Sequence, residues 1–117
     1  MSKIRRAAVL DVDGDFRRMV ADFLKGKGYD EVLETQDSQE VLDRHLADPF
    51  QLIVVEWEIP DLGGDIFLRK IARHNGRKCR IVVVLDGSNS VHIETKVGGY
   101  LLKPVSLNDL EKILGEP

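Results

Sequence analysis

Short apolar runs alternate along the chain with longer segments that mix apolar and polar residues. Continuous apolar runs of this kind are typical of strands that a parallel sheet buries on both faces. Three of the runs are strong, and two shorter or more mixed runs are weaker strand candidates. The predicted strands are, in chain order, residues 7–10, 31–35, 52–55, 81–85 and 100–102.

The segments between the strands carry apolar residues at helical spacing. In the clearest helix the apolar positions follow i, i+3, i+4, i+7 and i+8, and they are Phe16, Met19, Val20, Phe23 and Leu24. Two further helices begin at pairs with capping-box spacing, Asp37 with Glu40 and Ser106 with Asp109. The residues that we expect these two helices to bury are Val41, Leu42 and Leu46 in one, and Leu107, Leu110, Ile113 and Leu114 in the other.

The remaining segments complete an alternating pattern. A further helix is expected around residues 66–72, and the segment 87–99 is the hardest to interpret, with a short helix near 91–96. Strands that alternate with helices form βαβ units with right-handed crossovers. The pattern therefore predicts a single α/β domain over residues 1–117, a doubly wound five-stranded parallel sheet with flanking helices.

Charged residues follow directly on four of the predicted strands, and they are Asp11, Glu56, Asp86 and Lys103. In an open parallel sheet, ligands bind beyond the carboxyl ends of the strands, where the strand order reverses. We therefore expect these side chains to converge on one pocket. Because Lys103 is a cation among acids there, we expect it to form an ion pair with Glu56 or Asp86.

Composition narrows the class of protein. The chain has 117 residues, with 17 Lys and Arg against 20 Asp and Glu, and so a formal charge of −3. This balance argues against a protein whose main task is to coat DNA or an anionic membrane. No apolar run is long enough for a membrane span or a secretory signal, and the single Cys79 excludes an internal disulfide and a cysteine-based zinc site. We expect a soluble, cytoplasmic protein.

Three segments together resemble the receiver domain of response regulators in two-component signalling. Their sequences are VLDVDGDFRRMV, LIVVEWEIPDLGGDIFL and GGYLLKPVSLNDLEKIL. The resemblance covers about Ile4 to Leu114, and it implies a flavodoxin-like sheet in the order 2-1-3-4-5 with five flanking helices. Because the stretch between Asp86 and Lys103 is shorter than usual for the family, we expect the fourth helix to be shortened.

The resemblance also implies roles for the residues of the pocket. Receivers accept a phosphoryl group on an aspartate at the end of the third strand. Three further features support the reaction. They are an acidic pair that holds magnesium, a Thr or Ser after the fourth strand, and a Lys before a cis-Pro. Asp11 and the pair Lys103-Pro104 match this pattern. The departures are Val12 for the second acid of the pair, Glu56 for the phosphoacceptor and Asp86 for the hydroxyl residue.

These departures remove parts of the phosphoryl-transfer chemistry. Val12 offers no oxygen to magnesium, so Asp11 and Glu56 are the only candidate ligands, and we expect no cofactor beyond weak magnesium binding at most. The extra methylene of Glu56 moves its carboxylate by roughly 1 Å, a displacement that can cost about 100-fold in rate. Asp86 would repel a phosphoryl group. The resemblance therefore implies a pseudo-receiver, a signalling module that is not an enzyme.

The expected partners are proteins, such as a histidine kinase, an output domain or another signalling protein. Formation of a homodimer stays an open alternative. Binding to a membrane is not expected, and binding to nucleic acid through this domain is disfavoured. Two alternative functions also stay open. One is a working phosphoacceptor with an unusual site. The other is a phosphatase of the haloacid-dehalogenase type, because the sequence Asp11-Val12-Asp13 resembles the first motif of those enzymes.

Several residues have two interpretations. Glu56 is either a standing mimic of phospho-aspartate or a drifted residue, and Asp86 is either structural or part of a switch. Tyr100 occupies the position of an aromatic that turns inward in the family, and we expect it to be fixed by a hydrogen bond or by packing.

Residues 69–80 contain six Lys or Arg and no acid, which suits a solvated helix face or a docking patch for an acidic partner or nucleic acid. We expect the Trp57 side chain to be half-buried and to pack against its neighbours. We expect His45 and His92 to lie at the surface.

Overall fold

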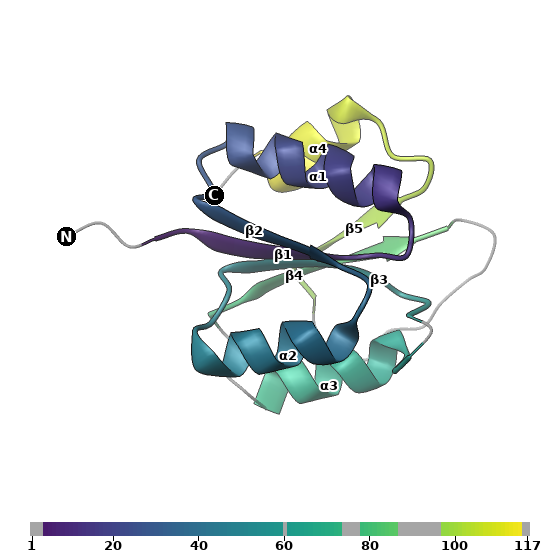
Figure 1. Ribbon diagram of the computed structural model, residues 1–117. Helices are drawn as coiled ribbons and strands as arrows, with labels where there is room; N and C mark the ends of the chain where they lie inside the picture. Colours follow the sequence, from purple (N-terminus) through teal and green to yellow (C-terminus); the bar gives the residue numbers. More distant parts are fainter. Residues whose placement is uncertain (1–3, 60, 74–77, 87–96, 116–117) are drawn as a thin grey trace.

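Five parallel strands form one central sheet with helices on both faces (Figure 1). The computed structural model describes residues 4–59, 61–73, 78–86 and 97–115. The strands lie in the order β2-β1-β3-β4-β5, and every neighbouring pair is parallel. Their bounds are Arg6–Leu10 (β1), Glu31–Thr35 (β2), Leu52–Glu56 (β3), Arg80–Leu85 (β4) and Gly99–Leu102 (β5).

In the described part of the chain, two helices lie on each face of the sheet. One face carries α1 (Gly14–Gly26) and α4 (Leu107–Leu114), and the other carries α2 (Ser38–Ala47) and α3 (Gly64–Arg73) (Figure 1). The doubly wound sheet and its strand order, expected from the sequence, are confirmed. The shortened fourth helix, expected near residues 91–96, lies outside the described residues.

The central strands are apolar throughout because both faces of the sheet are covered. Alternate residues of a strand enter two different cores: Val54 of β3 packs on the side of α1 and α4, and Val55 on the side of α2 and α3. Every position of β3 is buried except the last, Glu56. None of the helices in the described ranges is long and apolar enough to cross a membrane.

The two caps expected from the sequence are confirmed. Asp37 caps α2 through its side chain, and Ser106 and Asp109 form both hydrogen bonds of a capping box at the start of α4. The expectation that Leu107 faces the core is wrong, since this residue is 67% exposed. Leu107 is the first residue of α4, next to the exposed Ser106, and the buried stripe starts one turn later at Leu110.

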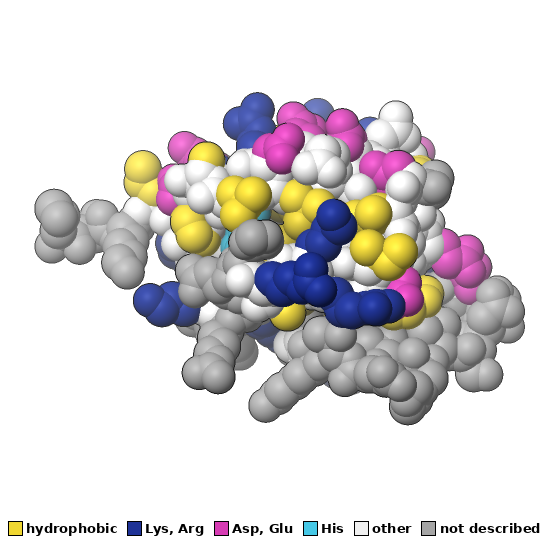
Figure 2. Space-filling model, turned by 90° about the horizontal axis from the view of Figure 1, so that it is seen from below, with side chains coloured by type: hydrophobic (Ala, Val, Ile, Leu, Met, Phe, Trp, Pro, Cys, Tyr) yellow, Lys and Arg dark blue, Asp and Glu magenta, His cyan; other side chains and the backbone are white. Residues whose placement is uncertain are grey.

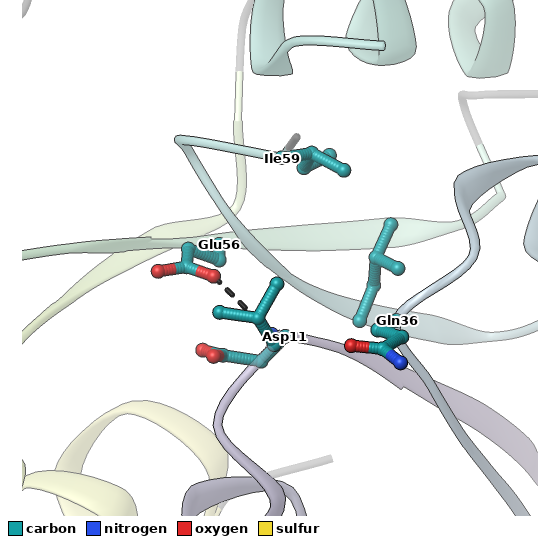
Figure 3. Close-up of a pocket in the computed structure, with 6 residues that line it drawn as sticks. Asp11, Gln36, Glu56 and Ile59 are labelled. Atoms are coloured by element: carbon teal, nitrogen blue, oxygen red, sulfur yellow. Dashed lines mark hydrogen bonds between the residues drawn. The ribbon is translucent and has the colours of Figure 1, made fainter. Parts of the chain in front are cut away.

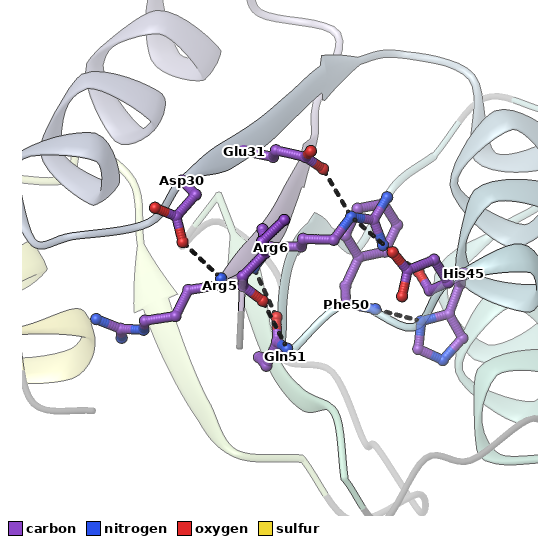
Figure 4. Close-up of polar contacts among 9 residues, drawn as sticks. Arg5, Arg6, Asp30, Glu31, His45, Phe50 and Gln51 are labelled. Atoms are coloured by element: carbon purple, nitrogen blue, oxygen red, sulfur yellow. Dashed lines mark hydrogen bonds and ion pairs between the residues drawn. The ribbon is translucent and has the colours of Figure 1, made fainter. Parts of the chain in front are cut away.

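His45 is buried rather than exposed, which corrects the expectation of a surface histidine. It is 1% exposed and takes the inward position on α2 that was expected for Leu46, which is 56% exposed. His45 Nδ1 accepts a hydrogen bond from the Phe50 N–H at 3.1 Å, and the two rings stack with centroids 6.0 Å apart (Figure 4). A buried backbone N–H needs an acceptor, so a ring nitrogen is favoured here over a leucine. His92 lies outside the described residues.

Arg6 ties the first strand to the loop before β3 at the amino ends of the strands. Its guanidinium lies over the Phe50 ring, 4.5 Å from the centroid, and its Nε lies 2.8 Å from Glu31 Oε2 (Figure 4). Its Nη1 donates a hydrogen bond to the carbonyl of Asp48. Packing and ion pairs hold this end of the sheet together beside an open hollow that Arg6 and Phe50 help to line. The expected pocket of charged residues lies at the opposite end.

Candidate functional site

Asp11 is the first residue after β1, and it is held in place on several sides. It is 2% exposed, its N–H donates to the Thr35 carbonyl at 3.1 Å, and its own carbonyl accepts a hydrogen bond from Arg17 Nη1 at 2.5 Å. Its side-chain Oδ1 accepts the Asp13 N–H at 2.9 Å. The backbone therefore positions a buried carboxylate at the carboxyl end of the sheet.

Lys103 follows β5 and brings its ammonium group to this carboxylate. Its Nζ lies 3.2 Å from Asp11 Oδ1 and 3.1 Å from Asp11 Oδ2, and 3.8 Å from Glu56 Oε1. The ammonium also lies over the Phe16 ring, 4.7 Å from its centroid. Asp11 Oδ2 is buried and accepts no hydrogen bond from the described residues, so the ammonium beside it is its main electrostatic partner.

Glu56 ends β3 and lies next to the Asp11–Lys103 pair. Its Oε2 accepts the Val12 N–H at 3.3 Å, the contact drawn in Figure 3. Partial burial, followed by the negative charge of Asp11, raises the pKa of Glu56 above its ordinary value. The Val12 N–H and the Lys103 ammonium act in the opposite direction and are outweighed.

A shallow hollow lies beside these groups (Figure 3). Gln36 and Ile59 border it on the side away from the carboxylates, and the apolar side chain of Val12 adds to its wall. The residues that line it are Leu10, Asp11, Val12, Gln36, Glu56 and Ile59. The polar groups of the site are therefore the two carboxylates, Gln36 and the Lys103 ammonium.

The structure brings together Asp11, Glu56 and Lys103, as the sequence predicted. Lys103 contacts both acids, and the expected pair of Lys103 with Glu56 is present as the longer contact. The closer partner of Lys103 is Asp11, which the sequence interpretation did not select. Asp86 follows β4 with an exposed side chain.

The other residues expected near the site lie at its edge. Pro104 is exposed and follows Lys103 through a cis peptide bond. Tyr100 lies on β5 opposite Val83 and is 47% exposed. Trp57 is half-buried as expected, and it packs so closely on the start of α3 that a Cβ at Gly64 would lie 2.5 Å from its ring.

A hydrogen-bonded link beside the site was not predicted from the sequence. The Asp61 carboxylate accepts hydrogen bonds from Ser38 Oγ at 2.8 Å and from the Ser38 N–H at 3.1 Å. Asp61 lies in the loop after β3, and Ser38 is the first residue of α2 and 3% exposed. Aspartate is common in loops and serine is common at the start of helices. Neither residue therefore stands out in the sequence, and the pair was not predicted.

The residues of the site do not fit a magnesium ion. Magnesium prefers octahedral coordination by oxygen ligands, but the ammonium of Lys103 already lies against the two carboxylates, and Val12 supplies no side-chain oxygen. Within the described ranges, no group of three or more His, Cys, Asp or Glu side chains is arranged to hold a metal ion.

The Asp-x-Asp sequence also does not form a phosphatase pair. Asp13 is the N-cap of α1, and its Oδ1 accepts the N–H groups of Asp15 at 3.0 Å and Phe16 at 3.2 Å. The Asp13 carboxylate therefore serves as the cap of α1 in this structure.

Comparisons with known proteins agree with this architecture. A family model described as the response regulator receiver domain matches residues 8–115. In sequence, the chain is similar to chemotaxis protein CheY1 of Helicobacter pylori, with 24% identity over an alignment that covers 92% of this chain and 94% of that protein.

Two solved structures illustrate the similarity of the fold. The REC domain of AraT, a response regulator from Geobacillus stearothermophilus, matches with a TM-score of 0.83 and 19% identity, covering 97% of this chain and 92% of that one. A chain of the co-crystal structure of Saccharomyces cerevisiae Ypd1 with the receiver domain of Ssk1 matches with a TM-score of 0.74 and 17% identity, covering 93% and 86%.

Replacing Lys103 by Met is expected to destabilise the protein by about 2–3 kcal/mol at neutral pH, because it leaves the buried Asp11 carboxylate without its counter-charge. The measurement is urea unfolding of the wild type and the variant. Lys112→Met, at an exposed position of α4, is the matched control and should change stability little. Adding Asp11→Asn to Lys103→Met should restore part of the loss. Equal stability of Lys103→Met and the wild type would contradict the importance of the pair.

Replacing Glu56 by Gln is expected to leave stability at neutral pH unchanged or to raise it. Because the pKa of Glu56 is raised in the folded protein, its ionisation costs folding free energy above that pKa, and Gln removes this cost. Thermal unfolding at several pH values should show the difference shrinking toward about pH 4, where Glu56 is largely protonated in both states. Glu58→Gln, at an exposed neighbouring position, is the control. A Glu56→Gln variant that is clearly less stable at neutral pH would mean that attraction to Lys103 dominates.

Proposed function

The chain belongs to the response regulator receiver domain family, and we propose that it is a pseudo-receiver, which signals through protein contacts without accepting a phosphoryl group on Glu56. The observation that carries the proposal is the position of the Lys103 ammonium, 3.1 Å from Asp11 and 3.8 Å from Glu56. This ammonium is the counter-charge of both carboxylates, at a site where Val12 offers no side-chain oxygen to a metal ion and Glu56 stands in place of the aspartate acceptor.

The electrostatics of the site support the same conclusion. Two carboxylates and one ammonium leave a local excess of negative charge, which opposes the approach of a phosphoryl donor. Receivers use a divalent cation to reduce this repulsion, and the residues present do not fit one.

Glu56 itself serves as a standing negative group in this proposal. Its carboxylate extends from the end of β3 toward Lys103 and is held by the Val12 N–H. A group fixed in this way supports one conformation of the site without phosphorylation, as a mimic of phospho-aspartate would. The proposal accordingly assigns the chain no enzymatic activity of its own.

The proposed partners are proteins of two-component signalling, such as a histidine kinase, a phosphotransfer protein or an output domain. The similar Ssk1 receiver domain was crystallised with the phosphotransfer protein Ypd1, which supports a docking role for this fold. Because the site does not require a phosphoryl group, binding is expected to be constitutive.

Incubation with acetyl phosphate and magnesium is expected to give no phosphoryl adduct, because the acceptor, the second acid and the hydroxyl residue are all replaced. Intact-mass spectrometry measures the adduct directly, with a receiver that has the full family pattern as the positive control. The variant Val12→Asp, Glu56→Asp, Asp86→Thr should regain part of the reaction. A near-stoichiometric adduct on Glu56 of the wild type would support the alternative of a working phosphoacceptor.

Addition of beryllofluoride and magnesium is expected to leave the NMR spectrum almost unchanged, because the site lacks the groups that bind this phosphoryl analogue. The measurement is a titration followed by two-dimensional amide spectra, with the Glu56, Leu85 and Tyr100 N–H signals as reporters. Large shifts that spread from Glu56 to Tyr100 would show that a two-state switch persists.

A further inference from the structure

One face of α3 carries exposed basic residues next to an exposed isoleucine. The four residues are spaced at i, i+3, i+4 and i+7 and therefore lie along one side of the helix. We call them the basic stripe, and they are Ile66, Arg69, Lys70 and Arg73. Ile66 is 42% exposed and the side chain of Arg69 is 65% exposed. The opposite side of α3 is buried through Phe67, Leu68 and Ile71.

The charges of the basic stripe are only partly neutralised. Arg69 Nη2 lies 3.1 Å from Asp65 Oδ2, one turn earlier on the same helix. Lys70 and Arg73 form no ion pair with an acid in the described parts of the chain. In sequence, residues 69–80 carry +6 although the whole chain carries −3, and three of these six positive charges belong to the basic stripe.

The basic stripe differs from an ordinary solvated helix face. On α1 the exposed positions alternate in sign along the helix, and they are Asp15, Arg18, Asp22 and Lys25. Mixed signs of this kind favour solubility and local ion pairs. Seen from the side of α2 and α3, Figure 2 shows dark blue side chains gathered in the middle of the face with yellow hydrophobic side chains beside them. The concentration of one sign next to an apolar group indicates a recognition surface.

We propose that the basic stripe docks an acidic helical segment of a partner protein. The stripe rises by about 10 Å from Ile66 to Arg73, or two helical turns. A partner helix with carboxylates at matching spacing would neutralise Lys70 and Arg73, and an apolar residue on it would cover Ile66. This surface lies on α3, apart from the pocket of Asp11, Glu56 and Lys103, and the proposal is independent of how that pocket works.

A protein segment fits the basic stripe better than nucleic acid does. The chain as a whole carries a formal charge of −3, which disfavours binding of an extended polyanion. The stripe contains no aromatic side chain on which a base could stack. Ile66 instead favours contact with an aliphatic side chain. A short protein segment with a few carboxylates and one apolar residue would both neutralise the cations of the basic stripe and cover Ile66.

The test is binding of fluorescent probes to the whole chain, measured by fluorescence anisotropy at low and at moderate salt. The main probe is a helical peptide of Glu and Leu, about 16 residues or roughly four turns long. The comparison probes are a poly-Glu peptide of the same length and a single-stranded homopolymer RNA. We expect the Glu/Leu peptide to bind most tightly. The variant Arg69→Glu, Lys70→Glu, Arg73→Glu should weaken its binding more than tenfold.

Two further variants separate the contributions of charge and apolar contact. Ile66→Ser should weaken binding of the Glu/Leu peptide several-fold and leave poly-Glu binding unchanged. The control Arg18→Glu, Lys25→Glu, Lys112→Glu makes the same change of net charge on the side of α1 and α4 and should change binding less than twofold. If the triple stripe variant fails to fold, Lys70→Gln with Arg73→Gln replaces it. No binding of the peptide, tighter binding of the RNA, or an equal loss in the control would overturn the proposal.

Discussion

The ion pair between Asp11 and Lys103 is the interaction on which the arrangement of the site depends. A carboxylate this deeply buried is stable only with an opposite charge and hydrogen bonds beside it. The Asp13 N–H supplies one hydrogen bond, and Lys103 supplies the positive charge from the end of β5, an edge strand of the sheet. The end of β5 is thereby tied to the end of β1, although β3 and β4 lie between them.

This pair determines what Glu56 can do. The Lys103 ammonium is shared between two carboxylates, and Asp11 is both closer and more buried. Glu56 therefore receives only part of the neutralisation, and its partial burial, followed by the negative charge of Asp11, raises its pKa. Two carboxylates and one ammonium leave the site with an excess of negative charge.

The fold was predictable because a sheet that is buried on both faces requires continuous apolar runs in its strands. The location of the site was predictable because the polar residues that follow these strands lie at the carboxyl edge of the sheet. The choice of Asp11 as the closer partner of Lys103 was not predictable, since it depends on differences of less than 1 Å between side-chain oxygens. His45 was missed because helical periodicity favours Leu46 as the apolar residue, whereas the acceptor required by the Phe50 N–H decides the position. Asp13 was ambiguous in sequence because helix caps and catalytic acids use the same residue type.

The hydrogen bonds from Ser38 to Asp61 join the loop after β3 to the first turn of α2. Gln36 and Ile59, which border the hollow beside Glu56, lie on the two segments that this link connects. The wall of the hollow is therefore mechanically continuous with α2, and through the packing of Trp57 on Gly64 with the start of α3 as well. A substitution that shifts the start of either helix would therefore also change the surroundings of Glu56.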